Sequence, residues 1–262
     1  MKKILVLLVI IILMFTLFGC STNSYFGPNI DKLVFVKNLI YSEDMDVYLY
    51  YIAPKDFDKD IKKIQIPNAP EGIDCVLYQE QKVSEGKYTV GTVQIGINCD
   101  YWNEETGIGN DLEINNLLIT WGDESQTTEN VGSITVTSDN MQCNKYMHTM
   151  KDNDVIKKTY TLTKDTEITG LDFPYHDEVF NFINNITIND IPLEKVSEDS
   201  PIKLKKNETC VVEYNVNDEN NSKYGNVIIR GFLMGKNKDK IVCFTFNKSF
   251  KDAGEYLKNQ SQ

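Results

Sequence analysis

The chain has 262 residues, a formal net charge of −11 and 25% charged residues. Such an acidic surface argues against binding to nucleic acid or to anionic lipid headgroups, because both are negatively charged themselves. Without its N-terminal segment the chain has the length of about one and a half typical domains, enough for one substantial core or two small ones.

Residues 1–19 have the layout of a secretory signal peptide. Lys2 and Lys3 precede an apolar run from Ile4 to Phe18, and the small residue Gly19 follows. A membrane-spanning helix needs about 20 apolar residues, and this run is shorter and lacks basic residues after it. Removing the segment takes away two lysines, which changes the net charge from −11 to −13.

The end of this segment, Leu17-Phe18-Gly19-Cys20, resembles the lipobox of bacterial lipoproteins. The resemblance implies that Cys20 receives a diacylglyceryl group and becomes the mature N-terminus, although Phe18 replaces the small residue usual at its position. Two acyl chains anchor a protein stably, whereas one binds only marginally. We expect a lipid anchor at Cys20 on the outer face of the cell membrane. The alternative is an ordinary signal peptide in which Cys20 is incidental.

Residues 20–30 are predicted to be a tether, and residues 31–140 a first β-sandwich domain. Apolar and polar residues alternate in short runs that are rich in strand-forming side chains, and turn residues separate these runs. The predicted strands of this domain are 33–36, 47–52, 64–66, 73–77, 88–98, 112–121 and 131–136. About seven short strands with frequent turns are typical of an immunoglobulin-like sandwich.

Residues 141–153 show little periodicity and are predicted to link this domain to a second β-sandwich domain, residues 154–262. Its predicted strands are 156–162, 167–173, 186–191, 202–205, 209–216, 225–233 and 240–246. Val179, Phe180 and Ile183 fit a strand or a short helix that begins at Asp177 and Glu178. A closing helix over residues 249–258 is predicted, with Ser249 as its cap. The fold class is therefore mainly β, with two sandwich halves.

Five cysteines follow Cys20, so at least one is free or paired with another molecule. Cys75 and Cys99 share the apolar faces of their predicted strands, which makes them a candidate disulfide if their Cα atoms lie within about 7 Å. The alternative is a pair of buried free thiols. Cys210 also faces inward, whereas Cys243 lies opposite the apolar face of its strand, which disfavours a bridge between these two.

Motifs for catalysis, cofactors and structural metals are missing from the sequence. It contains no G-x-S-x-G, H-E-x-x-H, phosphate loop, dinucleotide fingerprint or C-x-x-C, and only two histidines, His148 and His176. We therefore predict no catalytic residues, no cofactor and no metal site.

The candidate binding loop is the segment 100–111, which contains Tyr101, Trp102, Glu104 and Glu105. Aromatic side chains in a loop at the end of a sandwich are typical of a recognition surface on a rigid scaffold. The alternatives are a solvated acidic loop and a Trp102 that folds back to cap the core.

Two stretches resemble segments of uncharacterised surface lipoproteins of low-GC Gram-positive bacteria. The first is Leu118-Ile119-Thr120-Trp121-Gly122-Asp123, which returns through residues 131–134, and the second is Pro201-Ile202-Lys203-Leu204-Lys205-Lys206 with the strand after it. They cover about a fifth of the chain, and Asn207 replaces the glycine expected there. A single arginine and many Asn and Ile residues fit the AT-rich genome of such a bacterium. The resemblance implies no known activity.

These observations predict a membrane-anchored extracytoplasmic lipoprotein with a non-catalytic binding or envelope-accessory role. Its expected partners are the lipid bilayer, through the diacylglyceryl group, and an envelope protein or glycan. One alternative is a small hydrolase that uses two carboxylates on wall glycan or peptide. Another is a solute-binding lipoprotein, which the lack of an alternating βαβ pattern disfavours.

Overall fold

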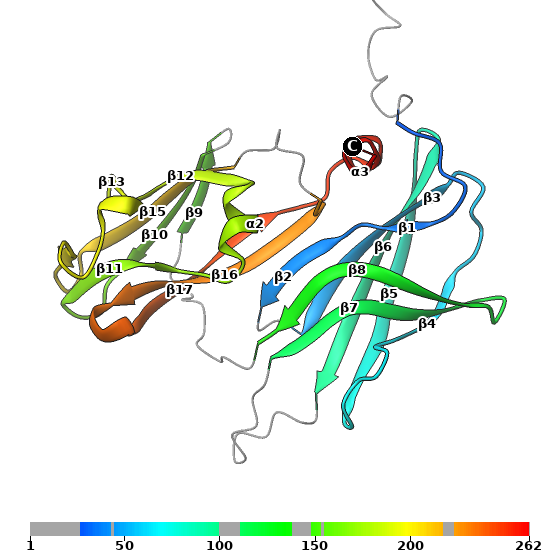
Figure 1. The fold of residues 1–262 in the computed structure, drawn as a ribbon, viewed down its shortest axis with the longest axis horizontal. Helices are drawn as coiled ribbons and strands as arrows, with labels where there is room; N and C mark the ends of the chain where they lie inside the picture. Colours follow the sequence, from blue (N-terminus) through cyan, green and yellow to red (C-terminus); the bar gives the residue numbers. More distant parts are fainter. Residues whose placement is uncertain are drawn as a thin grey trace, which may run out of the picture.

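Figure 1 shows a computed structural model of the chain, which describes residues 27–42, 45–99, 111–137, 148–152, 155–216 and 223–261. This part of the chain is mainly β-structure in three hydrogen-bonded sheets, with short helices beside them. The predicted fold class is therefore confirmed. None of the helices in these ranges combines the length and the apolar character that crossing a bilayer requires.

The first sandwich is built from residues before 138. One layer, called sheet A here, has the strand order β1 (Val34–Phe35), β3 (Asp46–Pro54), β6 (Tyr88–Cys99) and β5 (Ile73–Glu85). The facing layer contains β2 (Asn38–Ser42), β8 (Gln126–Val136), β7 (Leu112–Trp121) and β4 (Ile61–Gln65). Alternate side chains of both layers point inward, and Leu49, Val93 and Ile119 meet in one buried core.

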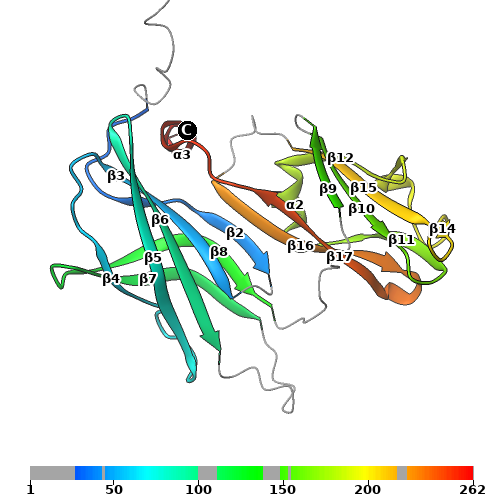
Figure 2. The ribbon, with the colours of Figure 1, turned by 180° about the vertical axis from the view of Figure 1, so that it is seen from behind.

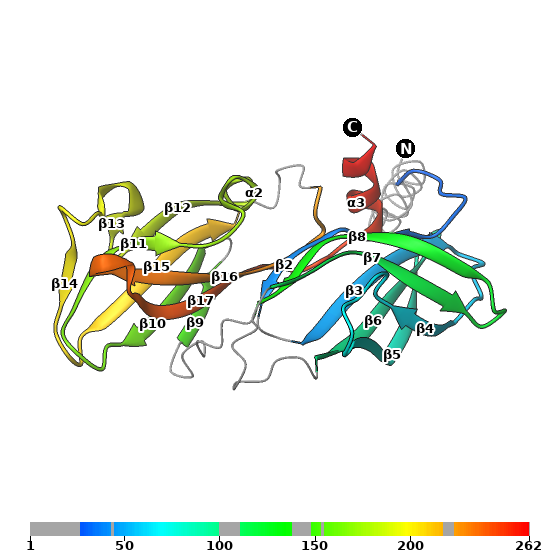
Figure 3. The ribbon, with the colours of Figure 1, turned by 60° about the horizontal axis from the view of Figure 1, so that its bottom comes forward.

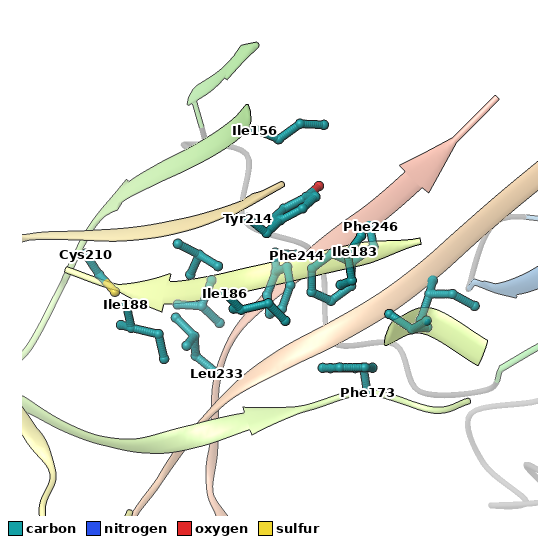
Figure 4. Close-up of a cluster of buried hydrophobic side chains, with 14 of the residues drawn as sticks. Ile156, Phe173, Ile183, Ile186, Ile188, Cys210, Tyr214, Leu233, Phe244 and Phe246 are labelled. Atoms are coloured by element: carbon teal, nitrogen blue, oxygen red, sulfur yellow. The ribbon is translucent and has the colours of Figure 1, made fainter. Parts of the chain in front are cut away.

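The second sandwich is built mainly from residues after 147. One layer has the order β13 (Ile191–Pro192), β12 (Ile183–Ile188), β15 (Thr209–Val216), β10 (Val155–Thr161) and β9 (His148–Asp152). The other contains β14 (Ile202–Leu204), β11 (Thr166–Asp172), β16 (Asn226–Gly235) and β17 (Lys240–Lys248). The 3-10 turns η2 (Leu193–Lys195) and η3 (Lys236–Lys238) lie beside them. Aromatic rings fill its core, where Phe246 lies 4.8 Å from Tyr214 and 5.1 Å from Phe173 between ring centroids (Figure 4).

One local prediction needs correction here, and one open choice is settled. Part of the predicted linker is a strand, because β9 pairs with β10 along residues 148–152. This strand lies at the edge of its layer, so its sequence lacks the apolar periodicity of a central strand. The open choice near Val179 is resolved by α2 (His176–Phe180), a short helix with Asp177 and Glu178 in its first turn, which precedes β12.

The two sandwiches share one continuous sheet. β2 belongs to the first sandwich, yet it pairs in parallel with β16 of the second, and on its other side with β8. Figure 3 shows β2 and β16 side by side at the centre of the molecule. Successive side chains of a strand point to opposite faces, so Leu39 enters the core of the second sandwich and Ile40 that of the first.

A buried amide pair holds this junction. Asn38 is fully buried and its Nδ2 donates to the carbonyl oxygens of Val36 at 3.0 Å and Val131 at 2.9 Å. The Asn38 side-chain oxygen accepts a 2.9 Å hydrogen bond from Nδ2 of Asn226, its neighbour on β16. Gly132 lies opposite Asn38 with φ +94°, and a Cβ there would come within 2.2 Å of the Asn38 carbonyl oxygen. Asn38, Asn226 and Gly132 therefore fit closely together, and position 132 has no space for a side chain.

The C-terminal helix α3 (Ala253–Gln260) is present, but it begins later than predicted. Asp252 caps it instead of Ser249, because the Asp252 carboxylate accepts a 2.6 Å hydrogen bond from the Glu255 amide. Although it follows the second sandwich in sequence, α3 packs on the first: Tyr256 and Leu257 lie in a small core with residues of β3 and β6. Figure 2 shows α3 beside the end of sheet A where β5 turns into β6.

The predicted Cys75–Cys99 disulfide is wrong, since Cys75 carries a free thiol. In the register of β5 with β6, Cys75 faces Ile97 and Cys99 faces Ile73. The two cysteines are therefore diagonal neighbours, with Cα atoms ~7–8 Å apart, beyond the usual reach of a disulfide. Cys210 is also free, whereas Cys243 is disulfide-bonded, so these two do not pair with each other.

Replacing Asn38 with Leu is expected to lower the free energy of unfolding by about 3 kcal/mol. The substitution removes the Asn38 partner from buried polar groups of Val36, Val131 and Asn226, and each unsatisfied buried group costs ~1–3 kcal/mol. Urea denaturation followed by tryptophan fluorescence measures the change. Asn130→Ala is the control, because its bond to Asn116 is exposed; its effect should stay within ~0.5 kcal/mol. Equal effects of the two substitutions would contradict a special role for the buried amide.

The cysteines are expected to separate into two classes on alkylation. Burial raises the pKa of the Cys75 and Cys210 thiols to about 12, so little thiolate exists at pH 8 and both should react slowly in the folded protein. Unfolding in denaturant without reductant should make both fully reactive, while Cys243 reacts only after reduction. Mass spectrometry of the digest tests this, and an unlabelled Cys75 in the unreduced, unfolded sample would contradict it.

Candidate functional site

Most site residues predicted from the sequence lie outside the described residues. This holds for Cys20 and for Tyr101, Trp102, Glu104 and Glu105 of the predicted loop, so lipidation and the loop stay predictions. The described strands β6 and β7 end and begin on either side of that loop.

The outer face of sheet A carries an ordered set of uncharged polar and aromatic side chains. In the register of its strands, Tyr48 of β3, Gln94 of β6 and Gln79 of β5 form one row across the sheet. Tyr50, Thr92 and Gln81 form the next row, two residues further along each strand. Cβ atoms in one row lie about 5 Å apart, so neighbouring side chains present one continuous surface.

A β-bulge adds a second exposed tyrosine to this face. The register between β5 and β6 shifts between Leu77 and Gln79, which leaves Tyr78 as an extra residue in β5. Its ring lies over Gly96, where a Cβ would come within 2.3 Å of the Tyr78 hydroxyl and 2.4 Å of Cζ. Bulges commonly redirect a side chain next to a functional site. Here the bulge and the glycine together hold a tyrosine flat on the sheet.

We call the set Tyr48, Tyr78, Gln79, Gln81, Thr92 and Gln94 the Tyr–Gln face. Tyr48 is 49% exposed and Tyr78 is 58% exposed. Five of the six residues, all except Tyr78, line a shallow depression of about 200 Å³. Within the described residues, no hydrogen bond uses the side-chain amide of Gln79, Gln81 or Gln94. These amides therefore point their donors and acceptors to solvent, whereas the buried amide of Asn38 is fully engaged.

The second sandwich has a larger depression, which is lined mostly by residues close together in the sequence. It measures about 600 Å³ and lies along β12, between Phe180 of α2 and Leu193 of η2. Its polar groups, including Asn184 and Asn185, come from one short stretch of chain at the irregular end of β12. The Tyr–Gln face instead collects side chains from three strands in fixed register, which is the firmer arrangement for recognition.

The half-buried carboxylate Glu80 has a structural role. It accepts hydrogen bonds from the Tyr51 hydroxyl at 2.5 Å and the Ile61 amide at 2.9 Å, and it lies 3.8 Å from Lys82. Lys82 in turn forms a 2.6 Å ion pair with Asp60. These contacts tie the edge strand β5 to β4. They use the polar atoms that a catalytic carboxylate would need for its substrate.

The titratable groups inside the second sandwich are enclosed in its core. Burial lowers the pKa of Lys158 to about 8, and its ammonium group donates to the Thr245 carbonyl oxygen. Burial also raises the pKa of Tyr160 far above its usual value, which keeps the phenol protonated. Among the described residues, no three His, Cys, Asp or Glu side chains are grouped so that they could hold a metal ion.

Comparisons with known proteins assign no family. No protein-family model matches the chain, and no curated protein matches its sequence. One similar solved structure is a protein of unknown function from Porphyromonas gingivalis W83, with 6% identity and a TM-score of 0.24. That match covers 82% of this chain and 95% of the other, and at this score it carries no structural argument.

Only part of the Tyr–Gln face can be predicted from the sequence. The alternation of residues 88–98 places Thr92 and Gln94 on the polar side of a strand, opposite Val93 and Ile95. The tyrosines and the other glutamines could not be added to them, because the strand order and the bulge at Tyr78 decide which residues become neighbours. The sequence does contain one indication of this face, the glutamines Gln79 and Gln81, whose spacing of two residues places them on the same side of a strand.

Proposed function

We propose that this protein is a lipoprotein of the cell envelope, anchored at Cys20 on the outer face of the cell membrane, and that it binds an envelope component without catalysis. The Tyr–Gln face is the binding surface. The observation that carries the proposal is an exposed set of tyrosines and unbonded amides, held in register on a rigid sheet of an acidic protein. The residues before Gly27 supply the anchor, as the lipobox resemblance implies.

The position of the first described residues supports this arrangement. Gly27 packs against Gly254 of α3 and the Tyr88 hydroxyl, and Tyr88 donates a 2.6 Å hydrogen bond to the Pro28 carbonyl oxygen. The chain therefore enters the fold at the α3 end of sheet A. Cys20 precedes Gly27 by seven residues, which span at most ~25 Å.

The binding face lies beyond this entry point. Gln94 follows Tyr88 by six residues along β6, a rise of ~20 Å. An anchor at Cys20 holds the α3 end close to the membrane, and the Tyr–Gln face then lies further out, at the level of wall material. This geometry favours an envelope ligand over the lipid surface itself.

Lipid anchoring is tested with the full chain and a Cys20→Ser variant in a Gram-positive host. The wild-type protein should enter the detergent phase on phase partitioning, because two acyl chains give stable membrane attachment. The variant should remain in the aqueous phase. Equal partitioning of both proteins into detergent would refute the anchor at Cys20.

Binding by the Tyr–Gln face is tested by sedimentation of the Cys20→Ser protein with isolated envelopes of the same host. Tyr48→Ala and Tyr78→Ala should each reduce the bound fraction, because they remove the exposed rings. Their free energies of unfolding should stay within ~0.5 kcal/mol of the parent, as for other exposed positions.

Tyr51→Ala is the matched control on the same strand, since Tyr51 is fully buried. It should cost ~3–5 kcal/mol of stability. Full retention of envelope binding by a double Tyr48→Ala, Tyr78→Ala variant would refute the Tyr–Gln face as the binding surface.

A further inference from the structure

We infer that the ligand of the Tyr–Gln face is a linear, uncharged glycan that crosses the strands of sheet A. This inference rests on the proposed function, because it names the ligand class of the same surface. It is carried by three properties of the face: the placement of its polar groups, its lack of charge, and its two exposed tyrosine rings.

The polar groups of the face lie at its centre and the apolar groups at its margin. Along β5, Gln79 and Gln81 lie between Val76, which is 40% exposed, and Val83, which is 65% exposed, and Gln94 pairs with Gln79 on β6. A protein–protein interface has the opposite anatomy, with an apolar centre and a polar rim. The arrangement therefore favours a hydroxyl-rich ligand over a protein surface.

The chemistry of the central side chains matches that of sugar hydroxyls. Each glutamine amide offers two donors and a carbonyl acceptor, and each sugar hydroxyl both donates and accepts. Gln94 and Gln79 are direct cross-strand neighbours, and Gln81 follows one row further along. The three amides have no protein partner among the described residues, so a ligand does not have to break protein hydrogen bonds to use them.

The electrostatics disfavour an anionic ligand. The six residues of the face carry no charge, and the acidic side chains Asp46 and Asp74 are exposed next to it. The whole chain has a net charge of −11, which repels a polyanion approaching from any side. Phosphate-bearing or carboxylated wall polymers are therefore disfavoured, and a neutral chain is favoured.

The row of Tyr48, Gln94 and Gln79 sets the direction of the ligand, because it crosses the strands β3, β6 and β5. The ring of Tyr78 reaches from β5 over Gly96 of β6, beside this row. Both tyrosine rings are exposed, and an aromatic ring offers a flat apolar face to the C–H face of a sugar. The depression of about 200 Å³ next to Tyr48 has room for one ring of a longer chain.

The inference is tested by calorimetric titration of the Cys20→Ser protein with neutral hexasaccharides of glucose, N-acetylglucosamine, galactose, mannose and xylose. At least one should bind, with an affinity that rises from monosaccharide to hexasaccharide and does not change between low and high salt, because no charges are paired. Tyr48→Ala and Tyr78→Ala should each weaken binding by about tenfold or more.

Two further variants locate the ligand. Gly96→Val keeps both tyrosines but pushes the Tyr78 ring off the sheet, so it should weaken binding as Tyr78→Ala does. Phe180→Ala is the matched control, an exposed aromatic ring on the other sandwich that lines the larger depression. It should leave binding unchanged, and a loss with Phe180→Ala alone would overturn the assignment to the Tyr–Gln face.

The glycan inference and the proposed function fail in different ways. If none of the hexasaccharides binds while Tyr48→Ala and Tyr78→Ala still lose envelope binding, the glycan inference is overturned and the proposed function stands. The same conclusion follows if protease treatment of the envelopes abolishes binding, since the partner is then a protein. If the tyrosine variants bind envelopes normally, both proposals fall.

Discussion

The parallel pairing of β2 with β16 is the constraint on which the architecture depends. It joins residues 38–41 to residues 226–229 and places one strand in the walls of two cores. The Asn38 amide fixes this register, because its hydrogen bonds reach Val131 on one side and Asn226 on the other. Polar groups in so buried a position are costly unless they are fully paired, so they specify one alignment of the strands. Sheet A, with the Tyr–Gln face, is thereby held at a defined place relative to the second sandwich.

Helix α3 adds a second connection between the sandwiches. The chain leaves β17 of the second sandwich and returns to cover the end of sheet A, where the Ala253 amide donates a 2.9 Å hydrogen bond to Glu85. This packing covers the apolar outer side chains Ile52 and Val90 of sheet A. The rows further along the same strands remain open, so α3 marks where the exposed face begins. A single sheet surface is therefore partly core and partly the exposed Tyr–Gln face.

Periodicity predicted those strands whose two faces differ clearly. Residues 112–121 were predicted as a strand and form β7, because buried and exposed side chains alternate along most of it. β5 was predicted only as far as residue 77, since the bulge at Tyr78 reverses its alternation and brings Glu80 and Lys82 to the inner side. β2 was missed, because it is buried on both faces and has no alternation to detect. The pairing of β2 with β16 depends on contacts between residues far apart in sequence, which a local pattern does not contain.

The shared strand also determines when the protein can complete its fold. A chain synthesised in N-to-C order presents β2 long before β16, since 188 residues separate Asn38 from Asn226. Until then the edge of β2 that β16 will cover has unpaired backbone groups, which are a template for association with other chains. Non-local pairings of this kind give a high contact order and slow folding. The nascent protein therefore depends on protection of this edge during the interval before β16 is synthesised and pairs with it.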